Sequence, residues 1–527
     1  MNCRPILTWW RMPTVSQSVP PFKIRRESPF SPNGLLAHTA PPPDEWNTQI
    51  VLPNLNCEKC TLQIVEFMAE HGPSYFYHHC ADLKIKADPN LPPANAAWPR
   101  GDLSPNFLTN AVISHAASGG GSRTAITLVN LDSVPAQFTL KFWGNDGSPG
   151  LVTLATVTGT INVGGSQTIQ TDESPPTLSS GWAQLTSPQL IDGTAIYRAS
   201  AAGREASLRL LNAGSPRLFF PFDNNDGAAM EIALTAPGAS ANVLGSLTLR
   251  NQLGQTISEE PPVAVPGNGR ISFMLPVRSS DPKDLRGAAR LDQSTSPIFG
   301  VGLRSNQGSF TSVDAIMPEA PSTKTIPYIA EGGSWKTTII LVNCDTVAAS
   351  FTLNFWGADG SPKAATTGTI PEGGTQTIEA NGLSVDTVPG WAEVLSNQCL
   401  GGTAMYRLQV SGQEAAASFL SRGGRKLVLP FDSGPGLTLG IAIANTSPSA
   451  DTTVSVTLRN EQGEIISNPA PIALARRQHT LFELAVPSNG AVMQRGVVEF
   501  NSANTDIFAV GIRTNNGAIT SIRALSR

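Results

Sequence analysis

The stretch LVNLDSVPAQFTLKFWGNDGSP, residues 128–149, returns as LVNCDTVAASFTLNFWGADGSP at residues 341–362. In its FTLKF segment, residues 138–142, apolar side chains alternate with polar ones, and a glycine-containing turn follows. Period-two alternation with one polar face is typical of a half-buried antiparallel strand. The stretch therefore predicts a fold that is all-β and duplicated.

The duplication covers about two hundred residues. Further matching segments are GTAIYR at 193 with GTAMYR at 402, LFFPFDN at 218 with LVLPFDS at 427, LTLRNQLGQ at 247 with VTLRNEQGE at 456, and FGVGLRSNQGSFTSV at 299 with FAVGIRTNNGAITSI at 508. The offset between the copies is 213 at first and 209 later. Each copy is itself double, because FTLKFWGNDGS and LTLRNQLGQTI share an alternating strand that ends in a glycine turn.

Four tandem units of about a hundred residues with short strands and turns predict immunoglobulin-like β-sandwiches. The Cys–Trp–Cys pattern of the immunoglobulin family is missing, so the prediction concerns the architecture and not membership of that family. We expect sandwiches at residues 106–214, 215–316, 326–422 and 423–527, with a linker at 317–325. Residues 86–105 hold five prolines and predict a second, semi-rigid linker. They follow a separate domain at residues 1–85, of which we expect 1–20 to be poorly ordered.

Composition narrows the function. The net charge is -4 without a basic block, so we expect no nucleic-acid partner. No run of eighteen apolar residues occurs, so we expect no membrane span. Few lysines, strands rich in Thr, Ser and Asn, and clustered cysteines favour an extracellular or cell-surface protein. The opening MNCRPILTWWRMPTV has too short an apolar run for a visible signal peptide.

The first domain ends in CEKCTLQIVEFMAEHGPSYFYHHCADLKI, residues 57–85, which gathers three of the six cysteines. A C-x2-C pair followed by His-His-Cys matches the ligand types of a zinc site. An oxidising compartment favours a disulfide instead, joining Cys80 to Cys57 or Cys60. The remaining thiol would then need Cys3. The residues alone leave both interpretations open.

Residues 22–85, with CxxCTLQ followed by YHHCAD, resemble the C-terminal portion of lytic polysaccharide monooxygenases of the insect and bacterial type that acts on chitin and cellulose. The resemblance implies an immunoglobulin-like sandwich and copper-dependent oxidative cleavage of the polysaccharide. In that family an N-terminal histidine and a second histidine hold the copper. An aromatic residue on the last strand lies axial to it, and Tyr77 matches this axial position.

The chain departs from the family at both copper-binding histidines. It begins MNCRP, and the segment RMPTVSQSV, where the second histidine is expected, has none. His78 and His79 are adjacent on a predicted strand, so they point to opposite faces. We therefore expect no metal ligand here and no cofactor for the chain as written, with copper belonging to a full-length parent.

The repeats offer candidate residues of their own. Trp143 and Trp356 fall on the outward face of their strands, where they either contact the next unit or stack on a sugar ring; we favour the contact between units. Trp182 and Trp391 are expected in the cores. We expect Glu205 and Glu414 to be solvated turn residues, and His115 and His479 to be isolated.

Cys344 and Cys399 replace Leu131 and Leu190 of the first copy, and both lie on predicted strands. Because both apolar positions became cysteine in the same copy, we predict a disulfide between them.

Two functions compete. The first is a polysaccharide-associated binding or spacer protein whose sandwich array does the binding and whose first domain is a truncated, non-catalytic remnant. The alternative is copper-dependent oxidative cleavage of chitin or cellulose by a full-length parent that supplies the missing half. A zinc-dependent module is a third, weaker hypothesis.

Overall fold

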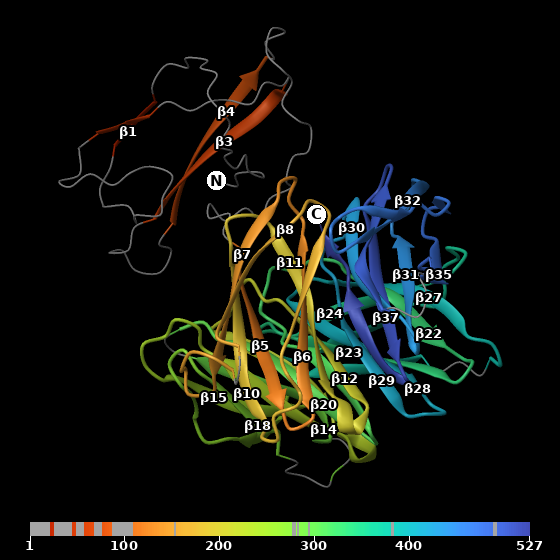
Figure 1. Cartoon of the computed structure of the whole chain (residues 1–527). Helices are drawn as coiled ribbons and strands as arrows, with labels where there is room; N and C mark the ends of the chain where they lie inside the picture. The colour runs from red at the N-terminus through yellow and green to blue at the C-terminus, as the bar shows by residue number, and fades with distance from the viewer. Residues whose placement is uncertain are drawn as a thin grey trace. The chain divides into compact units, whose positions relative to one another are not determined.

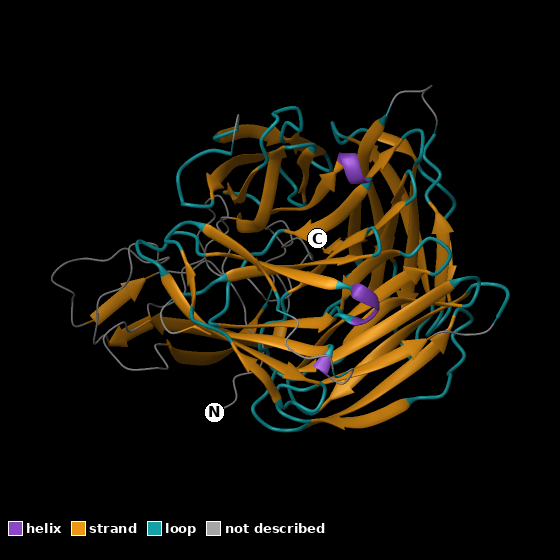
Figure 2. Cartoon of the chain, turned by 90° about the horizontal axis from the view of Figure 1, so that it is seen from below, coloured by secondary structure: helices purple, strands orange, loops and turns teal. Residues whose placement is uncertain are grey.

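Two units make up the chain in the computed structural model, Met1–Phe107 and Leu108–Arg527. The structure describes residues 22–25, 45–48, 57–67 and 76–86 of the first unit, and 109–526 of the second apart from 152–153, 277–280, 282–283, 294–295, 381–383 and 488–492. The described elements are antiparallel β-strands and two short 3-10 helices (Figure 2). No helix in these described parts has the length and apolar character that a membrane crossing needs.

The first unit is described as backbone alone for nearly all of these residues. Strand β1 (Phe22–Arg25) pairs with β2 (Glu45–Thr48), and β3 (Cys57–Phe67) pairs antiparallel with β4 (Phe76–Ile85). The resembling motif therefore forms two neighbouring strands. The predicted disordered segment 1–20, and the predicted linker 86–105 beyond residue 86, lie outside the described residues.

The second unit contains four pairs of sheets in chain order. Sheet pair 1 comprises β5 (Thr109–Gly119), β6 (Ser122–Asn130), β7 (Ala136–Gly144), β8 (Thr156–Ile161), β9 (Ser166–Gln170), β10 (Ser179–Ser187), β11 (Ile191–Ala199), helix η1 (Ser200–Ala202) and β12 (Arg204–Arg209). Sheet pair 2 comprises β13 (Arg217–Asp223), helix η2 (Asn225–Gly227), β14 (Ala229–Thr235), β15 (Val243–Asn251), β16 (Thr256–Glu259), β17 (Val263–Val265), β18 (Arg270–Met274), β19 (Arg286–Gln293), β20 (Phe299–Asn306) and β21 (Ser309–Asp314).

The second half of this unit repeats the same succession. Sheet pair 3 comprises β22 (Lys324–Glu331), β23 (Trp335–Asn343), β24 (Ala349–Gly357), β25 (Thr366–Ile370), β26 (Thr375–Ala380), β27 (Val388–Ser396), β28 (Leu400–Leu408) and β29 (Gln413–Ser418). Sheet pair 4 comprises β30 (Lys426–Ser433), β31 (Leu437–Asn445), β32 (Thr452–Asn460), β33 (Ile465–Ser467), β34 (Ile472–Leu474), β35 (His479–Glu483), β36 (Gln494–Ser502), β37 (Ile507–Asn515), β38 (Ala518–Arg523) and β39 (Leu525–Ser526).

The four pairs share one strand order. In pair 3 the orders are β22-β27-β24-β25 and β26-β23-β28-β29, and the other pairs repeat them. In pair 1 a short β5–β6 contact joins the two layers. The fold is thus all-β, built from antiparallel sheets in an arrangement consistent with β-sandwich units. The exact domain boundaries and the immunoglobulin-like identity stay predictions.

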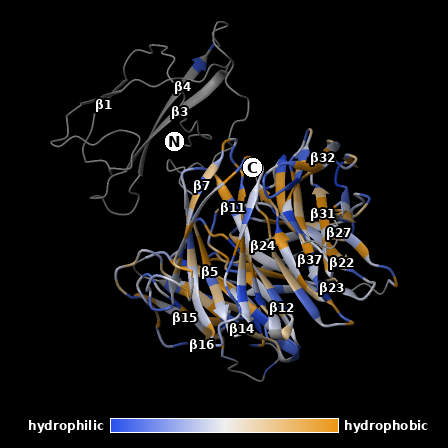
Figure 3. Cartoon of the chain, in the orientation of Figure 1, coloured by the Kyte–Doolittle hydropathy of each residue, from blue (hydrophilic) through white to orange (hydrophobic). Residues whose placement is uncertain are grey.

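The alternation in FTLKF places the core as expected. Phe138, Leu140 and Phe142 are buried while Lys141 is exposed. Their apolar cluster also contains Ile126 of the opposite layer, so apolar side chains of both layers meet between them. Figure 3 shows apolar and polar residues alternating along the strands of this unit.

One hydrogen bond recurs at every boundary between sheet pairs. In each case the residue after the third strand of a pair accepts from the backbone N–H of the first residue of a strand in the next pair. The bonds are Arg270 N to Asn145 O at 2.9 Å, Thr375 N to Gln252 O at 3.1 Å, His479 N to Ala358 O at 3.0 Å and Ser166 N to Glu461 O at 3.0 Å. The last bond joins pair 1 to pair 4, which also lie side by side in Figure 1, so the four pairs form a closed ring.

A glycine in each of these turns permits the approach. Gly147, Gly254, Gly360 and Gly463 all have φ between 74° and 87°, a region that side chains with a Cβ disfavour. A Cβ on them would lie 2.6, 2.5, 2.9 and 2.3 Å from a carbonyl oxygen of the neighbouring pair, respectively. The repeated turn glycine is therefore required both by its own conformation and by the contact that closes the ring.

The last full strand of each pair lies at the centre of the ring, where β12 contacts β21, β21 contacts β29, β29 contacts β38 and β38 contacts β12. Ala416 N donates to Thr311 Oγ1 at 3.1 Å, and the Ser312 and Ser521 hydroxyls donate to the carbonyls of Ser207 and Ala416. Small polar side chains allow these strands to approach closely, which explains the Ser, Thr and Ala of these segments.

The predicted Cys344–Cys399 disulfide is present, with Cα atoms 5.2 Å apart. Both cysteines lie just outside strand ends rather than on strands, because β23 ends at Asn343 and β28 begins at Leu400. The first copy has the same backbone contact, since Leu131 N donates to Leu190 O at 3.0 Å and Cys344 N to Cys399 O at 3.1 Å.

Replacing Cys344 and Cys399 together by alanine should lower the free energy of unfolding by about 2–4 kcal/mol, because the bond closes a loop in the unfolded chain. The two residues are 55 positions apart. Urea unfolding under non-oxidising and oxidising conditions measures this loss. An unchanged midpoint in the double variant would show that the bond adds nothing to stability.

Candidate functional site

Two pairs of stacked tryptophans lie between sheet pairs. Trp143 stacks on Trp182 at 5.8 Å between ring centres, and Trp356 stacks on Trp391 at the same distance. Trp143 and Trp356 are half-buried. The Arg477 guanidinium of pair 4 lies 4.5 Å from the ring centre of Trp356 in pair 3. The structure thus places Trp356 in a contact between units, the alternative that the sequence favoured.

Trp182 and Trp391 are fully buried, as the sequence predicted, but they do not lie between the two layers of their own sheet pair. Each is cross-strand partner to the outward-facing tryptophan, so it lies on the outer face of its sheet and not in the core between the layers. Both are fully buried nonetheless, since the next sheet pair covers them. Trp182 Nε1 donates to the Asn268 carbonyl at 3.1 Å, and Trp391 Nε1 donates to the Arg477 carbonyl at 2.8 Å.

The two histidines of the ring also lie at these contacts. His115 Nδ1 is 2.6 Å from Arg270 Nη2, and because arginine only donates, the imidazole is the acceptor. His479 stands at the repeat position of Arg270 and stacks on Tyr328, which stands at that of His115. Burial, and then the charge of Arg270, hold the pKa of His115 well below its usual range. Burial lowers the pKa of His479 to about 4.

These histidines predict acid sensitivity. Between pH 6.5 and about 4, His479 is protonated in the unfolded chain but stays neutral in the folded ring. Its contribution to the free energy of unfolding is therefore fully present above pH 6.5 and decreases as the pH falls below that value. One such group lowers the free energy of unfolding by up to about 1.4 kcal/mol per pH unit. His479→Phe should flatten this slope in urea unfolding measured from pH 7 to pH 4.5. Parallel curves for variant and wild type would contradict the assignment; His115 adds a slope of the same sign in both proteins.

Glu205 and Glu414 are not solvated turn residues, as the sequence suggested. Both are buried, and each forms an ion pair across the boundary between two adjacent sheet pairs. Glu414 accepts from Arg304 Nε at 2.9 Å and from Asn306 Nδ2 at 2.7 Å. Glu205 contacts the Arg513 guanidinium and the Asn515 amide in the same way. The error arose because a carboxylate beside a glycine turn looks exposed when the covering unit is distant in sequence.

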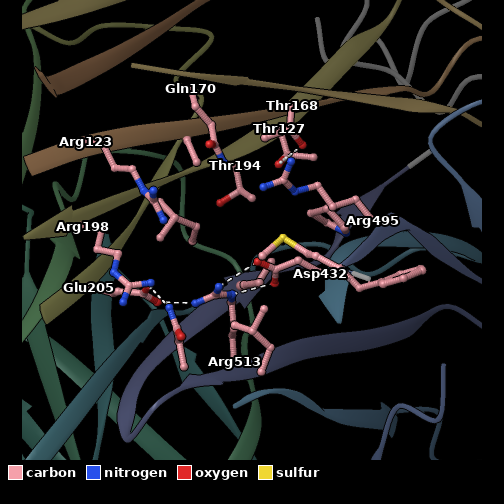
Figure 4. Close-up of a pocket in the computed structure, with 18 of the residues that line it drawn as sticks. Arg123, Thr127, Thr168, Gln170, Thr194, Arg198, Glu205, Asp432, Arg495 and Arg513 are labelled. Carbon is pink, nitrogen blue, oxygen red and sulfur yellow. Dashed lines mark hydrogen bonds and ion pairs between the residues drawn. The ribbon is translucent and has the colours of Figure 1, made fainter. Parts of the chain in front are cut away.

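A cleft of about 200 Å³ lies where pair 4 meets pair 1 (Figure 4). Its polar lining residues are Arg123, Thr127, Thr168, Gln170, Thr194, Arg198, Glu205, Asp432, Arg495, Arg513, Asn515 and Asn516. Strands β6, β9, β11 and β12 supply one wall, and β30, β36 and β37 supply the other. We call this the arginine cleft, after its four arginines.

Ion pairs tie most of these charges to the walls. Arg513 Nε and Nη2 each donate to Asp432 at 2.8 Å. Burial alone would lower the pKa of Arg513, but the hydrogen bonds and charges of Asp432 and Glu205 raise it overall. Arg198 Nη1 lies 3.4 Å from Glu205, while its Nε is buried without a hydrogen-bond partner. The Arg495 backbone pairs with Asp432 between β36 and β30, but the structure shows no ion pair or hydrogen bond from its side chain to another described residue.

Sequence reasoning missed the arginine cleft, although one pattern indicated part of it. Arg198, Arg304, Arg407 and Arg513 recur at the same strand position in all four units. A charge that recurs on strands otherwise filled by apolar and small residues indicates a shared contact. Nothing in the sequence shows that residues 123 and 495 meet across the closing boundary.

The candidate residues of the first unit lie outside the described side chains. These are Tyr77 and the Cys80 pairing with Cys57 or Cys60. Within the described residues, no group of His, Cys, Asp or Glu is arranged to hold a metal ion, and the two ring histidines are buried apart in aromatic contacts.

No protein-family model matches the chain, and no curated protein is similar to it.

Proposed function

We propose that the chain is an extracytoplasmic, polysaccharide-associated protein whose ring of sheet pairs binds a ligand rather than transforming it. The arginine cleft carries this proposal. Its described lining includes no histidine, cysteine or lysine, and both of its carboxylates are occupied by arginine. Such a lining supplies hydrogen-bond donors and positive charge for recognition and no base beside a nucleophile.

Other observations support the setting. The Cys344–Cys399 bond favours an oxidising compartment. The common strand order supports four immunoglobulin-like sandwiches as the building units. The association with polysaccharide rests on the resemblance of residues 22–85 to lytic polysaccharide monooxygenases.

Co-sedimentation of the full chain with chitin, cellulose and polygalacturonate tests the proposal. We expect retention on at least one polymer, and retention that survives replacement of Trp143 and Trp356 by alanine, since stacking with other protein groups occupies these rings. Failure to sediment with all three polymers would overturn the proposal. Loss of retention in the tryptophan variant would favour sugar stacking instead.

A second candidate function is copper-dependent oxidative cleavage in a longer parent that supplies the two histidines. The antiparallel pairing of β3 with β4, which carries both halves of the motif, favours it. For the chain described here we expect calorimetric titration with Cu²⁺ to show no sub-micromolar site. A tight site would contradict the view that both copper-binding histidines are missing.

A further inference from the structure

The ring contains an internal twin of the arginine cleft. The boundary of pair 2 with pair 3 has the same construction as the boundary of pair 4 with pair 1, because the two copies of the repeat meet in the same way at both. Each boundary carries four cationic side chains at matching repeat positions, which are Lys336, Arg407, Arg286 and Arg304 in the twin and Arg123, Arg198, Arg495 and Arg513 in the cleft.

In the twin, carboxylates neutralise all four. Glu379 accepts a hydrogen bond from Arg286 Nη2 at 2.9 Å, and its other carboxylate oxygen lies 2.9 Å from Lys336 Nζ. Asp226 lies 3.8 Å from Arg407. Partial burial, the largest single influence, would raise the pKa of Glu379. The hydrogen bonds and charges of Lys336 and then Arg286 together outweigh it and hold this pKa below its usual value. Asp223 and Glu414 complete the set by contacting Arg286 and Arg304.

The cleft lacks two of these four carboxylates. Gln170 stands at the position of Glu379, and Pro435 stands at that of Asp226. The remaining carboxylates, Glu205 and Asp432, both contact Arg513. Among the described residues, Arg123 forms an ion pair only with Glu173, at 3.4 Å, and Glu173 lies outside the lining. Arg495 is the counterpart of Arg286, which has two carboxylates, and it has none among the described residues.

The two boundaries also differ in how they are filled. In the twin, Ile340 and Met405 belong to the apolar cluster that continues from pair 2 into pair 3. Thr127 and Ile196 replace them in the cleft. Figure 4 shows the Arg495 side chain reaching toward Thr127 and Thr168, with open space between the walls. The cleft therefore differs from the twin in two separate respects: it has fewer carboxylates, and the residues at positions 127 and 196 belong to no buried apolar cluster of the described residues.

We propose that the arginine cleft binds an oxoanion group, a carboxylate, sulfate or phosphate, as carried by an acidic sugar. The inference rests on the proposed binding function and names its ligand class. A guanidinium fork matches the two oxygens of such a group, which makes Arg495 the principal contact. The Thr127 and Thr168 hydroxyls lie 3.1 Å apart, so one donates to the other, and the second hydroxyl and the Gln170 amide supply neutral donors beside Arg495. A volume of about 200 Å³ suits one small group or sugar unit rather than a large ligand.

Isothermal titration of the full chain with inorganic phosphate and with trigalacturonate tests the inference, using a neutral cello-oligosaccharide as comparison. Gln170→Glu restores the carboxylate of the twin, and we expect it to weaken both anions about tenfold or more. Arg495→Gln should do the same. Glu379→Gln makes the reverse change in the twin and should leave affinity at the cleft unchanged.

The outcomes separate this inference from the proposed function. Equal anion affinity in wild type and Gln170→Glu, with the variant folded by circular dichroism, would overturn the oxoanion site. Retention on chitin or cellulose without binding of either anion would overturn it too, while leaving the binding function intact. Anion binding that depends on Arg495, in a chain that no polysaccharide retains, would support the site and overturn the polysaccharide association.

Discussion

Glu414→Ala should lower the free energy of unfolding by about 3–5 kcal/mol, the larger of two matched effects. The variant leaves Arg304 without a carboxylate, although both side chains of this pair are only 5% exposed. Asn306 loses its acceptor as well. Removing one partner of a buried ion pair is costly because the other charge stays buried without compensation. Urea unfolding followed by circular dichroism measures the loss.

The other copy of the repeat supplies the control. Glu205→Ala removes the equivalent carboxylate, but Arg513 keeps both hydrogen bonds to Asp432. We expect a loss of about 1–3 kcal/mol there. Equal losses at positions 205 and 414 would show that Asp432 does not compensate, and a negligible loss at 414 would show that Arg304 reaches solvent.

Trp391→Ala should lower the free energy of unfolding by about 3–5 kcal/mol, the usual range for deleting a fully buried large side chain. The indole is covered by pair 4, stacks on Trp356 and donates to the Arg477 carbonyl. Its loss therefore acts on the boundary between pairs 3 and 4. Thermal or urea unfolding followed by circular dichroism is the measurement.

Two further variants separate packing from hydrogen bonding. Trp391→Phe keeps most of the packing and loses one hydrogen bond, for a cost of about 1 kcal/mol beyond the smaller ring. Trp356→Ala should cost less than Trp391→Ala because Trp356 is only half-buried. A larger loss at 356 than at 391 would contradict the arrangement described here.

The sequence predicts the strands and the repeat well, because both depend on local patterns. The alternation in FTLKF is local, and the disulfide was predicted by comparing the two copies of the repeat, so neither prediction required the long-range contacts to be known. The alternation also assigned Trp143 to the outer face. Its partner Trp182 was assigned to the core between the layers because the sequence does not show that the next sheet pair covers the outer face of this sheet.

The ring itself is not visible in the sequence. Glu205 meets Arg513 across 308 positions, and no local pattern links them. His115 and Arg270 of the first copy are replaced by Tyr328 and His479, respectively, in the second copy. Because the residue types differ, comparing the two copies does not show that both pairs form the same contact. The arginine cleft depends on the same long-range closure, so its residues become a site only when pair 4 reaches pair 1.

The hydrogen bond that recurs at all four boundaries makes every contact head-to-tail, with a donor edge on one side and an acceptor edge on the other. Contacts of this kind either close into a ring or continue as a filament, depending on the rotation between units. Four units close it here. A polypeptide carrying only one copy of the repeat would expose one donor edge and one acceptor edge that complement each other. Two such polypeptides would complete the same ring as a symmetric dimer, so the tandem duplication is equivalent to fusing the subunits of a dimer into one chain.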